Sequence, residues 1–168
     1  ADAVFAGFAD YYIPKDEWFN VIEFLEQTGD FSIIKNYSIN PGKSHLSQNR
    51  KFFDNAFKFK KLSKIVNFLS NSENQLAQLA LQKIEKNCPL AMTYTIEMLS
   101  ILSPKSTIED ALNLEYRFTS RAQEFGSFQE GVRAAIIDKD RKPNWQFEIN
   151  AVPNEIINEF FKPIQNFN

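Results

Sequence analysis

The sequence has little of the residue types that build disulfides and metal centres. Its 168 residues include one cysteine, Cys88, and one histidine, His45. A single cysteine excludes an internal disulfide and a cysteine-rich metal site, and a single histidine leaves too few partners for a histidine-based zinc or catalytic cluster. We therefore expect no metal site. We interpret Cys88 as a packing residue and His45 as an exposed loop residue.

Excess charge of one sign and long apolar runs are scarce too. The 19 basic and 21 acidic residues are mixed along the chain and give a net charge of −2, so nothing points to a nucleic-acid partner. No apolar run approaches the length of about 20 residues that a helix needs to span a bilayer, and no signal peptide pattern is visible. The segment KFFDNAFKFKK (51–61) is compatible with a membrane surface, but core phenylalanines with a solvated lysine face are favoured.

Glycine is rare as well, at five residues, and few segments have strand character. Hydrophobic residues make up 43% of the chain, which is typical of a globular protein. They recur mostly at helical spacing; after Pro14, for example, Trp18, Val21, Ile22 and Leu25 fall on one face. The sequence predicts an all-α fold.

Several residues mark where helices begin and end. Gly29 is suited to end the helix that follows Pro14. Pro89 suits the first turn of a helix, and a last short helix is expected after Pro153. Capping-box patterns at 72–75 and 106–109 predict two further helix starts.

One segment does not fit a helix. Tyr11, Tyr12 and Ile13, directly before Pro14, have the character of a short strand. A lone strand cannot satisfy its backbone groups, so either the segment is no strand or its sheet lies outside this chain. We expect residues 1–13 to be disordered, helical or paired with a second copy rather than an isolated strand.

The densest motif is FQEGVRAAIIDKDRKPNW (128–145). Gly131 inside a helix costs about 1 kcal/mol relative to alanine, which predicts the close approach of another backbone. Lys139 is expected at the negative end of this helix, where a cation is favoured, and Trp145 is expected to pack on the core. The side chains predicted to share the buried face are Val132, Ala135 and Ile136.

Together with LEYRFTSR (114–121) and NCPLAMTYTIEML (87–99), this motif resembles the C-terminal half of 3-hydroxyisobutyryl-CoA hydrolases. These form a branch of the crotonase, or enoyl-CoA hydratase/isomerase, superfamily. The opening ADAVFAGFADYYIP resembles the helix and strand that close the family's crotonase core. The resemblance implies a multi-helix C-terminal region with a short remnant strand near its N-terminus. Residues 1–14 would end the crotonase core, and residues 15–168 would form a single helical domain.

The resemblance also implies a function. In this family the substrate is an acyl-CoA thioester, whose oxygen is held by backbone N–H groups in an oxyanion hole, while an upstream glutamate and aspartate act on it. Those groups precede the matched region, so we expect no catalytic residue in this chain. The complete enzyme would be an acyl-CoA hydrolase of valine catabolism or an enoyl-CoA hydratase/isomerase. It would need no cofactor besides the CoA moiety of its substrate, could be a homo-oligomer, and would lie in the cytoplasm or the mitochondrial matrix.

The resemblance assigns ligand contacts to two positions. Lys139 matches a lysine that contacts the CoA nucleotide in the superfamily, and Phe118 matches an aromatic residue that contacts it too. Lys139 would pair with a phosphate, and Phe118 would stack on adenine. The alternative is a surface lysine and a core phenylalanine.

Two hypotheses for the whole chain follow. It is either the C-terminal helical part of a CoA-thioester enzyme, capping the active site without catalysing alone, or a self-standing helical interaction module derived from that fold. A coding sequence that continues upstream into a crotonase core would favour the first.

Overall fold

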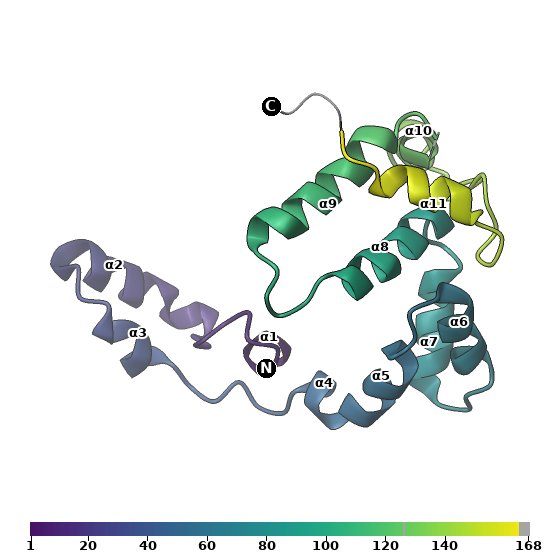
Figure 1. Cartoon of the computed structure of the whole chain (residues 1–168). Helices are drawn as coiled ribbons and strands as arrows, with labels where there is room; N and C mark the ends of the chain where they lie inside the picture. The colour runs from purple at the N-terminus through teal and green to yellow at the C-terminus, as the bar shows by residue number, and fades with distance from the viewer. Residues whose placement is uncertain (126, 165–168) are drawn as a thin grey trace. The chain divides into compact units, whose positions relative to one another are not determined.

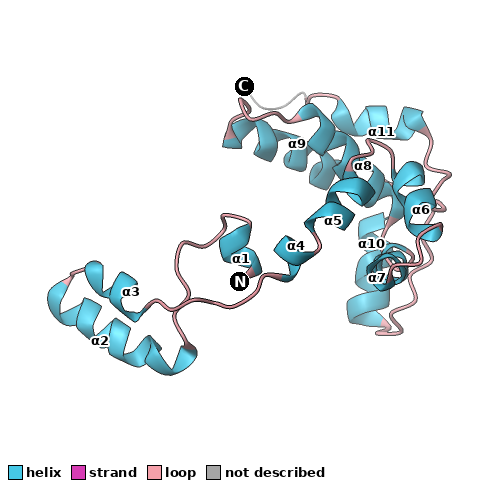
Figure 2. Ribbon diagram, turned by 90° about the horizontal axis from the view of Figure 1, so that it is seen from below, coloured by secondary structure: helices cyan, strands magenta, loops and turns pink. Residues whose placement is uncertain are grey.

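Helices are the only regular secondary structure in the computed structural model, which describes residues 1–125 and 127–164 (Figure 2). The all-α prediction is therefore confirmed. The chain divides into two compact units, Ala1–Asn55 and Ala56–Asn168, and α5 (Arg50–Phe57) crosses from the first to the second. None of the helices in these described ranges is long and apolar enough to cross a membrane.

The first unit is a set of short helices joined by hydrogen bonds at their ends. Asp2 Oδ1 accepts from Ser44 Oγ at 2.8 Å and from the Leu46 backbone N–H at 3.0 Å. The start of the chain thus holds the start of a helix more than 40 residues later. Besides α5, the helices of this unit are α1 (Asp2–Phe5), the 3₁₀-helix η1 (Lys15–Glu17), α2 (Trp18–Thr28), α3 (Ser32–Tyr37) and α4 (His45–Gln48).

The strand expected near the N-terminus is not formed. Residues 11–13 have no regular secondary structure, although the Ile39 backbone N–H donates to the Tyr12 carbonyl at 3.0 Å. A strand needs a ladder of such bonds from a neighbouring strand, and one bond does not make a ladder. Of the alternatives expected for residues 1–13, the helical one holds for Asp2–Phe5. The proposed domain boundary after residue 14 stays a prediction.

Helix α2 shows that the first unit buries little of its apolar surface. The helix ends as predicted at Gly29, which has a left-handed φ of 65° and donates its N–H to the Leu25 carbonyl. Of the predicted buried face, Val21 is buried, but Trp18 and Ile22 are each 53% exposed. The predicted helical period was right, but half of the predicted buried face is exposed. The most exposed rings in this unit belong to Phe8, Phe19 and Phe31.

The second unit is built around α11, which packs against both α8 and α9 (Figure 1). Pro89 is the first residue of α8, and Pro153 is the N-cap of α11, as both prolines predicted. In chain order the helices are α6 (Leu62–Ser70), α7 (Gln75–Ile84), α8 (Pro89–Ile101), α9 (Ile108–Arg121), α10 (Ser127–Val132), the π-helix η2 (Arg133–Ile137) and α11 (Asn154–Phe161).

The capping box of α9 lies one residue later than predicted. Thr107 is the N-cap: its Oγ1 accepts from the Asp110 N–H at 3.2 Å, and Asp110 Oδ2 accepts from the Thr107 N–H at 2.9 Å. The adjacent pairs Ser106–Thr107 and Glu109–Asp110 satisfy the same pattern in two registers, so the pattern alone could not choose between them. Helix α7 likewise begins after Asn74, which caps the Leu76 N–H, rather than after Ser72.

An aromatic cluster from α8, α9 and α11 forms the centre of the second unit's core. Phe160 is fully buried, with ring centroids 6.0 Å from Tyr94, 5.0 Å from Phe118 and 4.9 Å from Phe125. Such pairs add about 0.5–1.5 kcal/mol beyond the burial of area. The buried Tyr94 hydroxyl donates to the Leu114 carbonyl at 2.7 Å, so the one polar atom of the cluster is satisfied.

Two arginines of α9 hold the C-terminal end of α11. Arg117 Nη1 donates to the Phe161 carbonyl at 2.8 Å, and Arg121 Nη2 donates to the Pro163 carbonyl at 3.3 Å. The last carbonyls of a helix lack partners within the helix and carry partial negative charge. Arg117 therefore satisfies a terminal carbonyl of α11, Arg121 binds the segment that follows the helix, and the two bonds fix α11 against α9.

We predict that Phe160→Ala lowers the free energy of unfolding by about 3–5 kcal/mol, because the deleted ring leaves a cavity among three aromatic neighbours. Urea unfolding followed by circular dichroism measures this. Phe128→Ala is the matched control, since Phe128 is 61% exposed and its loss should change stability by about 0.5 kcal/mol or less. Equal effects of the two substitutions would contradict the assigned core.

Candidate functional site

The most organised polar site in the described residues is centred on Arg133. Its Nε and Nη2 donate to the two carboxylate oxygens of Glu130 at 2.9 and 2.8 Å. Its Nη1 donates to Asp138 at 2.6 Å and to Asp140 at 2.8 Å, and Nη2 also donates to the Lys142 carbonyl at 3.0 Å. A guanidinium has five N–H donors, and each of these bonds uses one of them. We call these five residues the Arg133 network.

The members of this network lie within 13 residues of one another along the chain, from Glu130 to Lys142. Glu130 lies three residues before Arg133 and so on the same side of the helix. The chain then leaves the helix through η2, where the Asp138 N–H donates to the Arg133 carbonyl at 2.8 Å, five residues back. This wider turn brings Asp138 and Asp140 back beside the guanidinium. A bidentate pair of this geometry is among the stronger polar contacts in proteins.

The π-helical turn also explains an error in the predicted buried face. Ala134 is 3% exposed, whereas Ala135 is exposed and Ile136 is 64% exposed. The prediction assumed the 3.6-residue repeat of an α-helix, and a π-helical turn departs from that repeat. The inward position therefore differs from the one predicted, and two isoleucines, Ile136 and Ile137, face solvent.

The backbone that leaves the network is strained at two residues. Lys139 and Arg141 have φ of 56° and 54°, and no other non-glycine residue in the described ranges has positive φ. That conformation costs about 1–2 kcal/mol for a residue with a Cβ. Two hydrogen bonds hold it: Arg141 N–H donates to the Ala134 carbonyl at 3.0 Å, and Lys142 N–H donates to Asp140 Oδ1 at 2.8 Å. Strain held in this way is a common mark of functional loops.

The network changes the titration of its acids. Hydrogen bonds from the Arg133 guanidinium, and after them the bond from the Asn144 N–H, lower the pKa of Glu130 from 4.5 to about 2. Arg133 and the Lys142 N–H likewise lower the pKa of Asp140. Both acids are therefore charged at neutral pH, and their charge is balanced by the guanidinium.

Gly131 lies beside an aromatic ring and not beside another backbone, so that part of the prediction is wrong. A Cβ at this position would lie 3.6 Å from Cη2 of Trp145. Trp145 comes from the loop after the network, and its Nε1 donates to the Lys86 carbonyl at 3.4 Å. Trp145 is thus held against α10 in the space that the glycine leaves free, whereas the prediction placed it on the core.

The two residues assigned to CoA binding have different surroundings. Lys139 is exposed and follows η2 in the strained loop. Phe118 is half-buried in the aromatic cluster, with its ring centroid 4.9 Å from that of Tyr94. The lysine is therefore accessible to a ligand as it stands, whereas one part of the phenylalanine ring is occupied by the core. Their role as ligand contacts stays a prediction.

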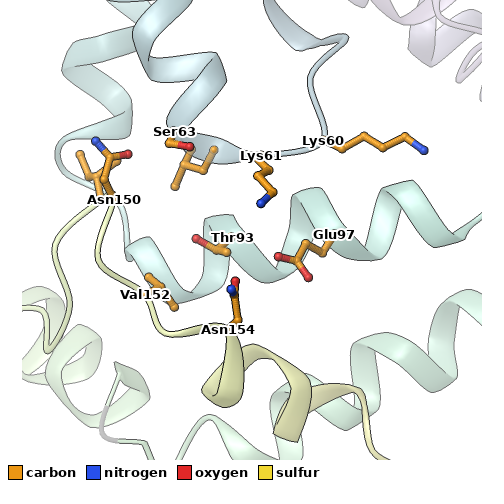
Figure 3. Close-up of a pocket in the computed structure, with 10 residues that line it drawn as sticks. Lys60, Lys61, Ser63, Thr93, Glu97, Asn150, Val152 and Asn154 are labelled. Atoms are coloured by element: carbon orange, nitrogen blue, oxygen red, sulfur yellow. The ribbon is translucent and has the colours of Figure 1, made fainter.

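A separate small cavity lies between α6, α8 and the loop before α11. Its volume is about 150 Å³, below the roughly 300–1,000 Å³ of sites for drug-sized ligands. Figure 3 shows Lys61 pointing toward Thr93, Glu97 and Asn154, whereas Lys60 points away. Elsewhere in the described ranges, no group of three or more His, Cys, Asp or Glu side chains is placed to hold a metal ion. The cavity thus offers a few polar contacts in a small volume.

Comparison with known proteins places the chain in a family. The family model described as enoyl-CoA hydratase/isomerase matches residues 1–161. The chain belongs to this family. Human mitochondrial 3-hydroxyisobutyryl-CoA hydrolase is 27% identical over 97% of this chain and 45% of its own length. The rat enzyme of the same name is 31% identical over 66% of this chain and 29% of its own length.

Solved structures agree with the family assignment. An enoyl-CoA hydratase from Rhodobacter sphaeroides 2.4.1 matches with a TM-score of 0.89 and 38% identity, covering 97% of this chain and 47% of that one. A carnitinyl-CoA dehydratase from Mycobacterium thermoresistibile has the same TM-score at 23% identity, which supports the fold alone. This member of the enoyl-CoA hydratase/isomerase family thus has the fold of the helical C-terminal region of crotonase-like proteins, and the chain spans less than half the length of these relatives.

The role of Arg133 was not predicted from the sequence. The signal was present in the order Glu130, Arg133, Asp138, Asp140, in which one arginine is flanked by acids. The two aspartates follow Arg133 by five and seven residues, which are not the three- or four-residue spacings at which neighbouring helical side chains pair. Only the folded loop brings the two aspartates to the arginine.

We predict that Gly131→Ala keeps or raises stability, whereas Gly131→Leu lowers it by about 1–3 kcal/mol. The alanine Cβ makes an ordinary contact with Trp145 and gains helix propensity, but the leucine branches overlap the ring. Thermal melts measure stability, and the tryptophan emission maximum reports the displaced ring. A leucine variant as stable as the alanine variant would show that Trp145 does not define this space.

We also predict that the stabilising effect of Glu130 disappears in acid. Because the folded-state pKa is depressed to about 2 from 4.5, the contribution is complete above about pH 4.5 and is lost as the pH falls through about 2. Urea unfolding of wild type and Glu130→Gln from pH 7 to pH 2 should show a stability difference that shrinks over this window. A difference that stays constant down to pH 2 would mean that the ion pair with Arg133 is not made.

Proposed function

We propose that this chain is the C-terminal helical part of a CoA-thioester enzyme, a 3-hydroxyisobutyryl-CoA hydrolase or a close hydratase/isomerase relative. In that role it caps the active site and does not catalyse alone. The observation that carries the proposal is the family match over residues 1–161. The human hydrolase aligns with 97% of the chain, which supports the hydrolase branch.

The proposal divides the chemistry between two parts of the enzyme. A thioester carbonyl gains negative charge in the transition state and needs preorganised N–H donors, together with a carboxylate that moves a proton or attacks. We assign those groups to the half of the relatives that lies outside the match. This chain would contribute side chains that line the active site, cations that bind the ligand, and oligomer contacts. The complete enzyme would lie in the cytoplasm or the mitochondrial matrix.

Lys139 and Phe118 are the proposed contacts for the CoA nucleotide. The exposed ammonium of Lys139 is suited to a phosphate, since it is a compact cation with three donors. Phe118 would stack on adenine through the part of its ring that the aromatic cluster leaves uncovered. Lys139 is the better supported of the two, because an adenine ring would have to approach Phe118 beside Tyr94.

A helical interaction module derived from the same fold is the second candidate. The exposed rings of the first unit favour it: Phe8 is 89% exposed and Phe31 is 75% exposed. Apolar surface of this kind marks contacts with another protein surface. A crotonase core would cover such a surface equally well, so the two candidates differ in whether CoA takes part.

We predict that the purified 168-residue chain turns over neither 3-hydroxyisobutyryl-CoA nor crotonyl-CoA. Co-expression with the remaining half of the Rhodobacter sphaeroides hydratase should give a complex that co-purifies and binds CoA. Release of free thiol and loss of crotonyl absorbance measure the two reactions. Turnover that tracks the pure chain through gel filtration would refute the division of labour, and a chain that never pairs with the core half would favour the interaction module.

A further inference from the structure

Two cations lie in the loop that follows Arg133 but form no ion pair with any other described residue. Lys139 and Arg141 are both exposed, both left-handed, and separated by Asp140. Neither forms an ion pair within the described ranges, whereas the acids on either side of Lys139 both bond to Arg133. The loop thus sorts its charges: the carboxylates of Asp138 and Asp140 are bound by the guanidinium, and the two cations stay available.

This sorting depends on a guanidinium and not merely on positive charge. Five donors in a fixed planar fork reach Glu130, both aspartates and the Lys142 carbonyl at once. A lysine offers three donors from a single point. Without the fork, at least one aspartate would be released to compete for the neighbouring cations, and the Lys142 N–H, whose bond to Asp140 helps to hold the strained backbone, would lose a fixed acceptor.

We propose that Arg133 is the positioning residue of a phosphate site whose binding groups are Lys139 and Arg141. The inference rests on the proposed function, in which Lys139 contacts the CoA nucleotide. It adds Arg141 as the second cation, whose planar fork can bind two phosphate oxygens. It also adds Arg133, which touches no ligand and acts by holding both cations in the conformation that binds.

Binding of adenosine 3′,5′-bisphosphate, measured by calorimetry at low salt, tests the proposal. Lys139→Ala and Arg141→Ala should each weaken binding about tenfold, and Arg133→Lys should weaken it by at least as much although it keeps the charge. Arg50→Lys is the matched control, because Arg50 forms an exposed pair with Asp54 in the first unit, and it should leave the affinity unchanged.

A second variant separates positioning from simple unfolding. Glu130→Gln removes the charged bidentate partner but leaves the two aspartates, and it should lower the affinity while the helical circular-dichroism signal stays at the wild-type level. If Arg133→Lys does not fold, this variant carries the test. Affinity that is unchanged in a folded Arg133→Lys or Glu130→Gln protein would overturn the positioning role and leave the proposed function intact.

Two further outcomes distinguish this inference from the proposed function. No binding of the bisphosphate by the wild-type chain overturns the phosphate site. Binding of the bisphosphate that depends on Arg133, combined with no binding of CoA by the complex with a core half, supports the phosphate site and refutes the CoA assignment.

Discussion

The bidentate ion pair between Arg133 and Glu130 fixes the conformation of the segment that runs from α10 through η2 to Trp145. Glu130 accepts from the guanidinium through both of its oxygens, and its Oε1 also accepts from the Asn144 N–H at 2.6 Å. The helix end and the end of the loop are therefore tied to one carboxylate. Nη1 of the same guanidinium donates to Asp138 and Asp140. The end of the loop places the Trp145 ring beside Gly131. The pair is only partly exposed, so solvent weakens it less than it weakens a fully exposed pair.

The two units differ in how they satisfy their apolar residues. The second buries an aromatic cluster around Phe160, and arginines from α9 complete the end of α11. The first relies on polar contacts such as Asp2 with Ser44 and leaves large rings exposed. Burial of apolar area is the main favourable term in folding, so the second unit has the means to be stable by itself. The first leaves much of its apolar surface exposed.

Membership of the enoyl-CoA hydratase/isomerase family gives this arrangement a context. The matched relatives are about twice as long as this chain or longer, so the chain corresponds to about half of each relative or less. What this half offers is charge held at defined positions on a helical support. A loop strained at Lys139 and Arg141 is retained only where surrounding bonds over-determine it, and here the bonds from Arg133 to Asp138, Asp140 and the Lys142 carbonyl add to the two hydrogen bonds that hold the backbone.

Local chemistry in the sequence determined the helical class and several helix ends. Gly29 ends α2 because glycine adopts a left-handed φ without strain, and Pro89 and Pro153 begin helices because proline lacks an N–H that a first turn does not use. Tertiary structure decided the rest. A strand near Tyr12 would need a neighbouring strand, and the apolar face of α2 would need another element packed against it. The presence of such a neighbour is not determined by the local sequence. The role of Arg133 was also undetermined, because its partners meet it only after a π-helical turn reverses the chain.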